Sequence, residues 1–295
     1  MASRVSAASQ FAVYGPTFLD VVMGPLDGPP VPGREAWVEG ALMCAGGAAN
    51  QAIALARLGA PVRLHSRVGV DQMGVFVDEM LAREGVDTSP CEHVGDQNIT
   101  VSLSFDGDRA MTTRGSVDLP PLEGEAPASL LADVRGIASN YAMVTQWRAR
   151  GTWVLADTAW DEAGAWDEAD LEALRLADVC TPNEEEALAY ARTESVEDAA
   201  RWFASFGCDC VVTCGKNGVI ACVDGQILRV PAPAVSAVDT TGAGDVFSAA
   251  LAWALRARHA SWPEALALAC AAAAHSTQGI GGSSSAPYAA DLLDA

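Results

Sequence analysis

Apolar residues along most of the chain follow two spacings, one typical of buried strands and one typical of helices. Strand-like runs occupy residues 11–15, 62–69, 152–158 and 208–215. Residues 48–59 and 72–85 have helical spacing, and each of these segments ends at a glycine. The order strand, helix, strand, helix predicts a parallel sheet with right-handed crossovers.

Residues 99–105 depart from this order because their apolar and polar side chains alternate strictly. Ile99, Val101, Leu103 and Phe105 fall on one face of a strand, and small hydroxyl residues fall on the other. A turn at 106–108 and a returning run at 109–113 predict an antiparallel hairpin with one exposed face. Together with the strand-like segment 34–44, this hairpin predicts a small sheet separate from the main one.

Charge and length narrow the class of protein. The chain has 295 residues, half of them hydrophobic, and a net charge of −20. A surface this acidic argues against nucleic acid or an anionic membrane as a partner. No apolar run reaches the roughly 18 residues that a membrane span needs, and the first residues lack the apolar core of a secretory signal. We therefore expect a cytoplasmic protein with a loose N-terminal tail of about eight residues, and we expect its eight cysteines to be small core residues.

The stretch DTTGAGD at 239–245 carries the clearest chemistry. Gly242, Ala243 and Gly244 precede a helical run, so their amides lie at the positive end of a helix dipole and can approach an anion closely. Asp245 is out of place as an anion binder but suits a base that takes a proton from an attacking hydroxyl. The plainer alternative is a glycine-rich loop with a capping aspartate. The stretch lacks the third glycine and the N-terminal position of a dinucleotide fingerprint.

Four motifs in the chain resemble, in the same order, those of the ribokinase-like (PfkB) carbohydrate kinase family. DTTGAGDVFSAALAWAL is similar to the family's C-terminal signature, and residues 44–74 resemble its N-terminal signature, with Asn50 in place. TPNEEE at 181–186 resembles the family's Asn-x-x-Glu motif, and VVTCGKNG at 211–218 resembles the strand and turn that reach the nucleotide. Together these motifs cover nearly the whole chain.

The resemblance implies a doubly wound, mostly parallel α/β sheet flanked by helices, with a small β-sheet lid that often forms a dimer contact. The catalytic domain is expected at 9–33, 46–97 and 116–295, with the lid at 34–45 and 98–115. The implied activity is transfer of the γ-phosphoryl of ATP, with Mg²⁺, to a hydroxymethyl group of a sugar or nucleoside. The implied assembly is a homodimer through the lid.

The same resemblance assigns roles to individual residues. Asp245 would be the general base, with Gly242, Ala243 and Gly244 as the anion hole. The other expected contacts are Asp20, Gly46, Gly47 and Asn50 with substrate, Asn183, Thr213, Gly215, Lys216, Gly218 and His275 with the nucleotide, Glu186 with Mg²⁺ through water, and Asp239 and Thr241 with a monovalent cation such as K⁺.

Several of these assignments have a plainer alternative. Asp20 could be a turn residue, Asn50 a residue at a helix N-terminus, Glu186 ordinary helix surface, and His275 a satisfied histidine at a helix end.

Departures from the family pattern leave the substrate open. Ala45 replaces the first glycine of the usual Gly-Gly pair, and the stretch before 152–158 is short, which predicts a trimmed crossover helix beside the substrate. The residues support a free-sugar kinase of ribokinase or fructokinase type. A nucleoside kinase would be favoured by an aromatic clamp, for which Phe18, Trp37, Trp147 and Trp160 are candidates, and a silent sugar-binding sensor is the remaining alternative.

Overall fold

The computed structural model describes residues 11–105, 108–161 and 163–293. The predicted N-terminal tail and residues 106–107 of the predicted turn lie outside the described residues. Eight of the described strands form one sheet: β1 (Phe11–Tyr14), β4 (Val62–His65), β9 (Ser129–Asp133), β10 (Trp153–Asp157), β11 (Val179–Cys180), β12 (Asp209–Thr213), β13 (Val219–Val223) and β14 (Gln226–Val230).

The order of this large sheet confirms the predicted α/β class. The strands run β14-β13-β12-β11-β10-β9-β1-β4. The six from β12 to β4 are parallel, and β13 and β14 add an antiparallel hairpin at one edge. In a sheet of this kind the carboxyl ends of the parallel strands meet at one edge, where ligands bind.

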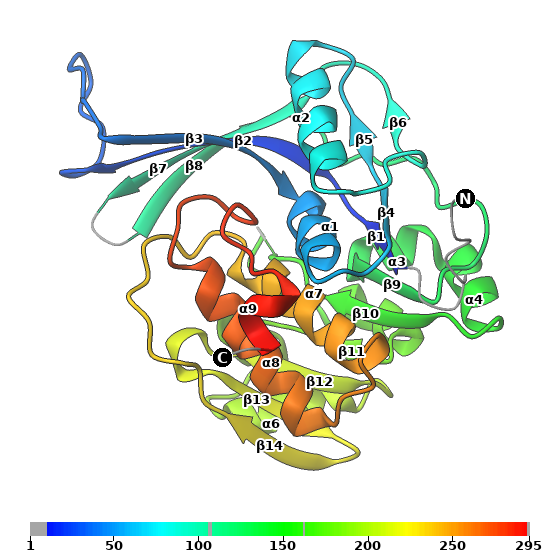
Figure 1. The fold of residues 1–295 in the computed structure, drawn as a ribbon. Helices are drawn as coiled ribbons and strands as arrows, with labels where there is room; N and C mark the ends of the chain where they lie inside the picture. Colours follow the sequence, from blue (N-terminus) through cyan, green and yellow to red (C-terminus); the bar gives the residue numbers. More distant parts are fainter. Residues whose placement is uncertain (1–10, 106–107, 162, 294–295) are drawn as a thin grey trace.

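Helices cover both faces of the large sheet (Figure 1). One face packs against α1 (Ala48–Arg57), α2 (Gln72–Arg83), α7 (Ala243–Arg256) and α8 (Trp262–Ser276), with α9 (Ala289–Leu293) beside them. The other face packs against α3 (Val134–Ser139), α4 (Tyr141–Arg148), the 3₁₀ helix η2 (Glu168–Leu176), α5 (Glu184–Ala191) and α6 (Val196–Ala204).

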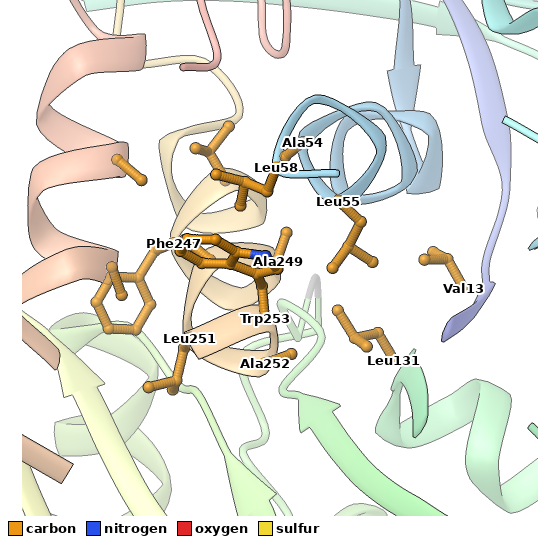
Figure 2. Packing of buried hydrophobic residues seen from close by; sticks show 14 of the residues in the cluster. Val13, Ala54, Leu55, Leu58, Leu131, Phe247, Ala249, Leu251, Ala252 and Trp253 are labelled. Atoms are coloured by element: carbon orange, nitrogen blue, oxygen red, sulfur yellow. The ribbon is translucent and has the colours of Figure 1, made fainter. Parts of the chain in front are cut away.

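The core between α1, α7 and the sheet fixes the two helices that later carry the site. Figure 2 shows Leu55 of α1 and Leu58, the residue that follows this helix, beside Trp253 of α7, with Val13 and Leu131 of the sheet close by. All five side chains are buried. Burying an aliphatic or aromatic side chain of this size contributes about 1.5–3 kcal/mol, so α1 and α7 are held firmly against each other.

A separate four-stranded sheet projects over α1 and α7 (Figure 1). It contains β3 (Gly40–Gly47), β2 (Thr17–Leu26), β7 (Asn98–Phe105) and β8 (Asp108–Arg114), in that order. The predicted hairpin is therefore present as β7 and β8. The short strands β5 (Arg67–Val68) and β6 (Glu92–His93) pair with each other outside both larger sheets.

The structure differs from the sequence-based prediction at three places. Residues 17–26 form the centre of the small sheet, although we expected them in the large unit, because β3 and β7 pair with both of their edges. Residues 34–39 are not a strand, and β3 begins only at Gly40. The crossover between β9 and β10 holds two short helices, α3 and α4, where we expected one trimmed helix.

The cysteines match their predicted role as small core residues. All eight are free, and seven are buried. Cys208, Cys210 and Cys214 lie in the same core cluster. Within the described ranges, no group of three or more His, Cys, Asp and Glu side chains is arranged to hold a metal ion. No helix among those residues has the length and apolar character to cross a membrane.

Candidate active site

The DTTGAGD stretch leads directly into α7. Gly242 is the N-cap of that helix and has φ of 69°, a left-handed conformation that favours glycine. A Cβ at this position would lie 2.7 Å from Cα of Gly282. No side chain caps α7. The Ala243 amide donates to the Thr240 carbonyl at 3.3 Å, but amides at a helix N-terminus have no partner within the helix and can bind an anion. Gly244 is exposed, and a Cβ there would meet no atom within 4 Å, so this turn opens to the outside.

Asp245 lies on the first turn of α7 and faces the first turns of α1. Asn50 Nδ2 donates to its Oδ2 at 3.0 Å, and Gln51 Nε2 donates to its Oδ1 at 3.4 Å. Burial raises the pKa of Asp245 to about 6, and the bonds from Asn50 and Gln51 act in the opposite direction. A carboxylate with a pKa near 6 is largely ionised at neutral pH and can still accept a proton in a reaction.

Asp20, Gly46 and Gly47 meet where β2 and β3 pair at the base of the small sheet. A Cβ on Gly46 would lie 1.8 Å from Oδ2 of Asp20, so glycine is required for that carboxylate to lie against the strand. Gly47 has φ of 63° and is the N-cap of α1. Burial, and then the charges of Asp245 and Asp239, raise the pKa of Asp20 to about 6. The predicted substrate residues therefore lie close to the predicted base.

Asp239 ties the loop before α7 to the loop after α8. Its Oδ1 accepts bonds from the amide and the hydroxyl of Thr241 at 2.9 and 2.7 Å. Its Oδ2 accepts from the amide of Gly281 at 2.9 Å. The structure thus brings together Asp239, Thr241 and the 279–285 segment.

Asn183 and Glu186 form a capping box at the start of α5. The Asn183 side chain accepts from the amide of Glu186 at 2.9 Å, and Oε2 of Glu186 accepts from the amide of Asn183 at 3.1 Å. The Thr158 hydroxyl donates to the same Oε2 at 2.6 Å. Glu186 is buried, and burial raises its pKa. It is therefore not ordinary helix surface.

A second carboxylate, Asp157 at the end of β10, lies near this group. Burial raises its pKa well above the usual value, and the charges of Glu186, Asp245 and Asp133 add to the effect. Mutual repulsion of this kind is relieved when a dication binds between carboxylates. The arrangement fits Mg²⁺, which is bound by few carboxylates and retains several waters.

The predicted nucleotide residues lie at the adjacent ends of β11 and β12. Thr213 pairs with Asn183 in an isolated bridge, and its amide donates to the Pro182 carbonyl at 3.0 Å. The next turn contains the 3₁₀ segment η3 (Gly215–Asn217) and closes through a 2.8 Å bond from the Cys214 amide to the Gly218 carbonyl.

Two cationic or polar side chains flank this turn and the neighbouring α8. Lys216 is exposed on η3 and is the only lysine in the 295 residues. His275, also exposed, has its Nδ1 3.0 Å from the Ser285 carbonyl oxygen. His275 therefore contacts the same 279–285 segment that Asp239 holds.

The aromatic candidates for a base clamp are dispersed. Trp147 is buried in the core, and Trp37 is 88% exposed. Trp160 packs edge-on against Trp166. Phe18 alone is near a predicted substrate residue, because a Cβ on Gly47 would lie 2.7 Å from its ring.

Sequence reasoning missed three residues of this region. Gln51 contacts Asp245, and Asp157 lies near Glu186. Arg57 at the end of α1 donates through one nitrogen to the carbonyls of Ser283, Ser284 and Ala286 at 2.9–3.0 Å. Only Asp157 carried a usable signal, since a carboxylate at the carboxyl end of a parallel strand points to a site.

Comparisons with known proteins identify the family of the chain. The pattern of the pfkB family of carbohydrate kinases matches residues 39–121 and 122–289. A fructokinase from Klebsiella pneumoniae is 34% identical over 280 aligned residues, which cover 85% of this chain and 91% of that protein. A ribokinase from Haemophilus influenzae is 31% identical over 268 residues, covering 84% of this chain and 86% of that protein. The chain belongs to the pfkB family of carbohydrate kinases, and it is an ATP-dependent sugar phosphotransferase.

Solved structures confirm the ribokinase-like fold. Arabidopsis thaliana ribokinase, in complex with ribose and ATP, superposes with a TM-score of 0.81 at 24% identity and covers 97% of this chain and 98% of its own. Vibrio cholerae fructokinase, bound to fructose, ADP and calcium, has a TM-score of 0.79 at 25% identity with coverage of 98% and 99%. An Escherichia coli structure with ATP and Mg²⁺ has a TM-score of 0.81 at 20% identity, with coverage of 97% and 98%.

Proposed function

We propose that this kinase transfers the γ-phosphoryl of MgATP to a hydroxymethyl group of a free sugar, with Asp245 as the general base. The observation that carries the proposal is the position of the Asp245 carboxylate. It lies on the first turn of α7, immediately after the Gly242 turn, and within reach of amide donors from α1. Its pKa of about 6 suits a base at neutral pH.

The reaction needs one proton transfer and one phosphoryl transfer. Asp245 accepts the proton of the sugar hydroxyl while that oxygen forms a bond to the γ-phosphorus and the bond to the β-phosphate oxygen breaks. The first-turn amides of α7, from Gly242 to Gly244, donate to the equatorial phosphoryl oxygens, where negative charge is spread. Asp20 and the α1 start, with Gly46, Gly47 and Asn50, orient the sugar hydroxyls.

Metal and nucleotide contacts follow from the neighbouring strand ends. Glu186, with Asp157 nearby, would hold Mg²⁺ through water, and the bound ion would neutralise charge on the phosphates. Asn183, Thr213, Gly215, Lys216, Gly218 and His275 would line the nucleotide site. The contact between Asn183 and Thr213 supports this grouping, because it joins the metal side of the site to the nucleotide turn.

A monovalent cation is the third ion that we propose, at Asp239 and Thr241. Oxygen ligands from these residues and from the 279–285 segment suit a hard cation such as K⁺. Rates measured without sodium should be higher in potassium than in a bulky organic cation. Equal rates in the two salts would refute the cation site.

We propose that the small sheet serves as the lid over the sugar and as the dimer contact. Period-two alternation places Asp20 on its inner face and Val21, Met43 and Val101 on its outer face, where these three residues are aligned across strands. Met43 is 50% exposed and Val101 is 36% exposed. An apolar strip of this kind on a sheet outside the core suits a homodimer.

A sugar is favoured over a nucleoside because only Phe18, among the aromatic candidates, is near a predicted substrate residue. The test is ADP release from MgATP across a panel of free pentoses, hexoses, sugar phosphates and nucleosides. We expect turnover with ribose or fructose, because relatives 34% and 31% identical to this chain are named fructokinase and ribokinase. Turnover restricted to nucleosides would overturn the acceptor class, and tight sugar binding without turnover would indicate a sensor.

A further inference from the structure

The base is held by two consecutive carboxamides on α1. Asn50 and Gln51 are the third and fourth residues of that helix, and each donates to a different oxygen of Asp245. Both side chains are buried, at 3% and 7% exposure. Asn50 belongs to the predicted substrate set, whereas no motif assigned any role to Gln51.

The charged side chains near Asp245 are negative. Asp20 of β2 and Asp157 of β10 are close enough for the charge of Asp245 to raise their pKa values. Among the described residues, no arginine, lysine or histidine forms an ion pair with Asp245. The two carboxamides are therefore the side chains that favour its ionised, proton-accepting form.

The two carboxamides make different contacts with the Asp245 carboxylate. The Asn50 amide is packed between two backbones, because a Cβ on Gly282 would lie 2.4 Å from its Oδ1 and a Cβ on Gly242 would lie 3.1 Å from its Nδ2. It binds Oδ2 alone, which leaves the carboxylate free to turn about that single contact. The second contact, from Gln51 to Oδ1, fixes the plane of the carboxylate.

We propose that Gln51 is a positioning residue for the base: it orients the Asp245 carboxylate and keeps it ionised. This inference rests on the proposed function, in which Asp245 accepts the sugar proton. It assigns to α1 a role in the chemistry beyond that of a sugar-binding helix.

The test is the pH dependence of kcat/KM for the sugar in Gln51→Met, which keeps the length and helix preference of the side chain but removes the donor. Losing a donor to a carboxylate raises its pKa. The acidic limb of the profile should move up by about 0.5–1 pH unit. This shift is small for a hydrogen bond to a carboxylate, because the bond from Gln51 to Asp245 is long. At pH 5.5 kcat/KM should fall about three- to tenfold, while at pH 8 it should stay within about twofold.

Two further variants make the result specific. Gln146→Met makes the same substitution at an exposed position in α4 and should leave the limb in place. Gln51→Glu puts a third carboxylate beside Asp245 and should move the limb further than Gln51→Met does. If Gln51→Met fails to fold, Gln51→Leu, which also removes the donor, replaces it, because a shift in Gln51→Glu would follow from the added charge alone.

The outcomes separate this inference from the proposed function. An unmoved limb in the folded Gln51 variants, with kcat/KM lowered equally at every pH or not lowered at all, overturns the positioning role. In an Asp245→Asn background, adding Gln51→Met should change the residual rate by no more than about twofold, because Gln51 acts through the carboxylate. If Asp245→Asn keeps the wild-type rate, the proposed base is wrong, whatever the Gln51 variants do.

Discussion

Replacing Asp245 with asparagine should make the protein more stable at neutral pH. Burial raises the pKa of Asp245 from 3.8 to about 6 in the folded protein. Between these two values the folded state binds more protons than the unfolded state does, so the free energy of unfolding falls as the pH rises through this window. Above about pH 6 the carboxylate is ionised and its whole destabilising effect on the folded state is present. Asparagine cannot ionise, so the substitution removes this effect.

The size of the gain follows from that shift. A pKa shift of about two units lowers the free energy of unfolding by about 3 kcal/mol at pH 8. At pH 4.5 the loss is about 1 kcal/mol, because the carboxyl is mostly protonated in the folded state. An asparagine offers one acceptor to the two donors from Asn50 and Gln51, and the donor left unpaired costs about 1 kcal/mol. We therefore expect Asp245→Asn to be more stable than wild type by about 2 kcal/mol at pH 8 and equal to it near pH 4.5.

Urea unfolding followed by tryptophan fluorescence at the two pH values measures this difference. Asp27→Asn is the control, because it removes a carboxylate from an exposed loop and should change stability little at either pH. A variant that is less stable than wild type by the same amount at both pH values would refute the reasoning, since it would show that lost contacts outweigh the buried charge.

Three further predictions address the substrate, nucleotide and lid surfaces. Gly46→Ala places a methyl group against the Asp20 carboxylate. The KM for sugar should therefore rise at least about tenfold, while the KM for ATP stays unchanged. An unchanged KM for sugar would show that Asp20 does not contact the substrate. Lys216 is the only lysine, so an N-hydroxysuccinimide ester should acylate its side-chain amine, and peptide mass spectrometry can follow this reaction. MgATP should slow the acylation, whereas sugar should not. An acylation rate that is the same with and without MgATP would show that Lys216 is not in the nucleotide site. In sedimentation velocity, Met43→Glu should give monomers. Leu293→Glu, a matched change at an exposed residue of α9, should remain dimeric. A dimeric Met43→Glu would exclude the outer lid face.

The large sheet and its helices were predictable because their signal is local. Residues 48–59 and 72–85 have an apolar stripe at helical spacing, and the glycines that end these helices stand in the sequence itself. The Gly242 turn was predictable for the same reason, because small residues directly before a helix predict an anion-binding turn. Strand β2 was missed for the opposite reason. It is held in the small sheet by β3 and by β7, which lies some 80 residues away in the chain.

The contacts within the site were predictable only as a set of neighbours. Motif order placed Asn50 and Asp245 in one pocket, but no local pattern could show that the Asn50 amide donates to the base across 195 residues of chain. Arg57 is the clearest case, since it forms a salt bridge with Glu84 and also donates to backbone carbonyls of Ser283, Ser284 and Ala286. Such a contact depends on how α1 and the last loop pack, and composition or spacing cannot report it.

The identity of the base is the central claim, and rapid-quench phosphoryl transfer tests it most directly. Wild type and Asp245→Asn are mixed with γ-labelled MgATP and a sugar found to turn over, and ATP affinity is measured separately by calorimetry. The account predicts that the transfer rate falls by at least about 10²–10⁴ in the variant. The Kd for ATP should change by no more than about threefold, since the proposed role of Asp245 is toward the sugar and not the nucleotide. A variant that transfers phosphoryl groups at a tenth of the wild-type rate or faster would contradict the account.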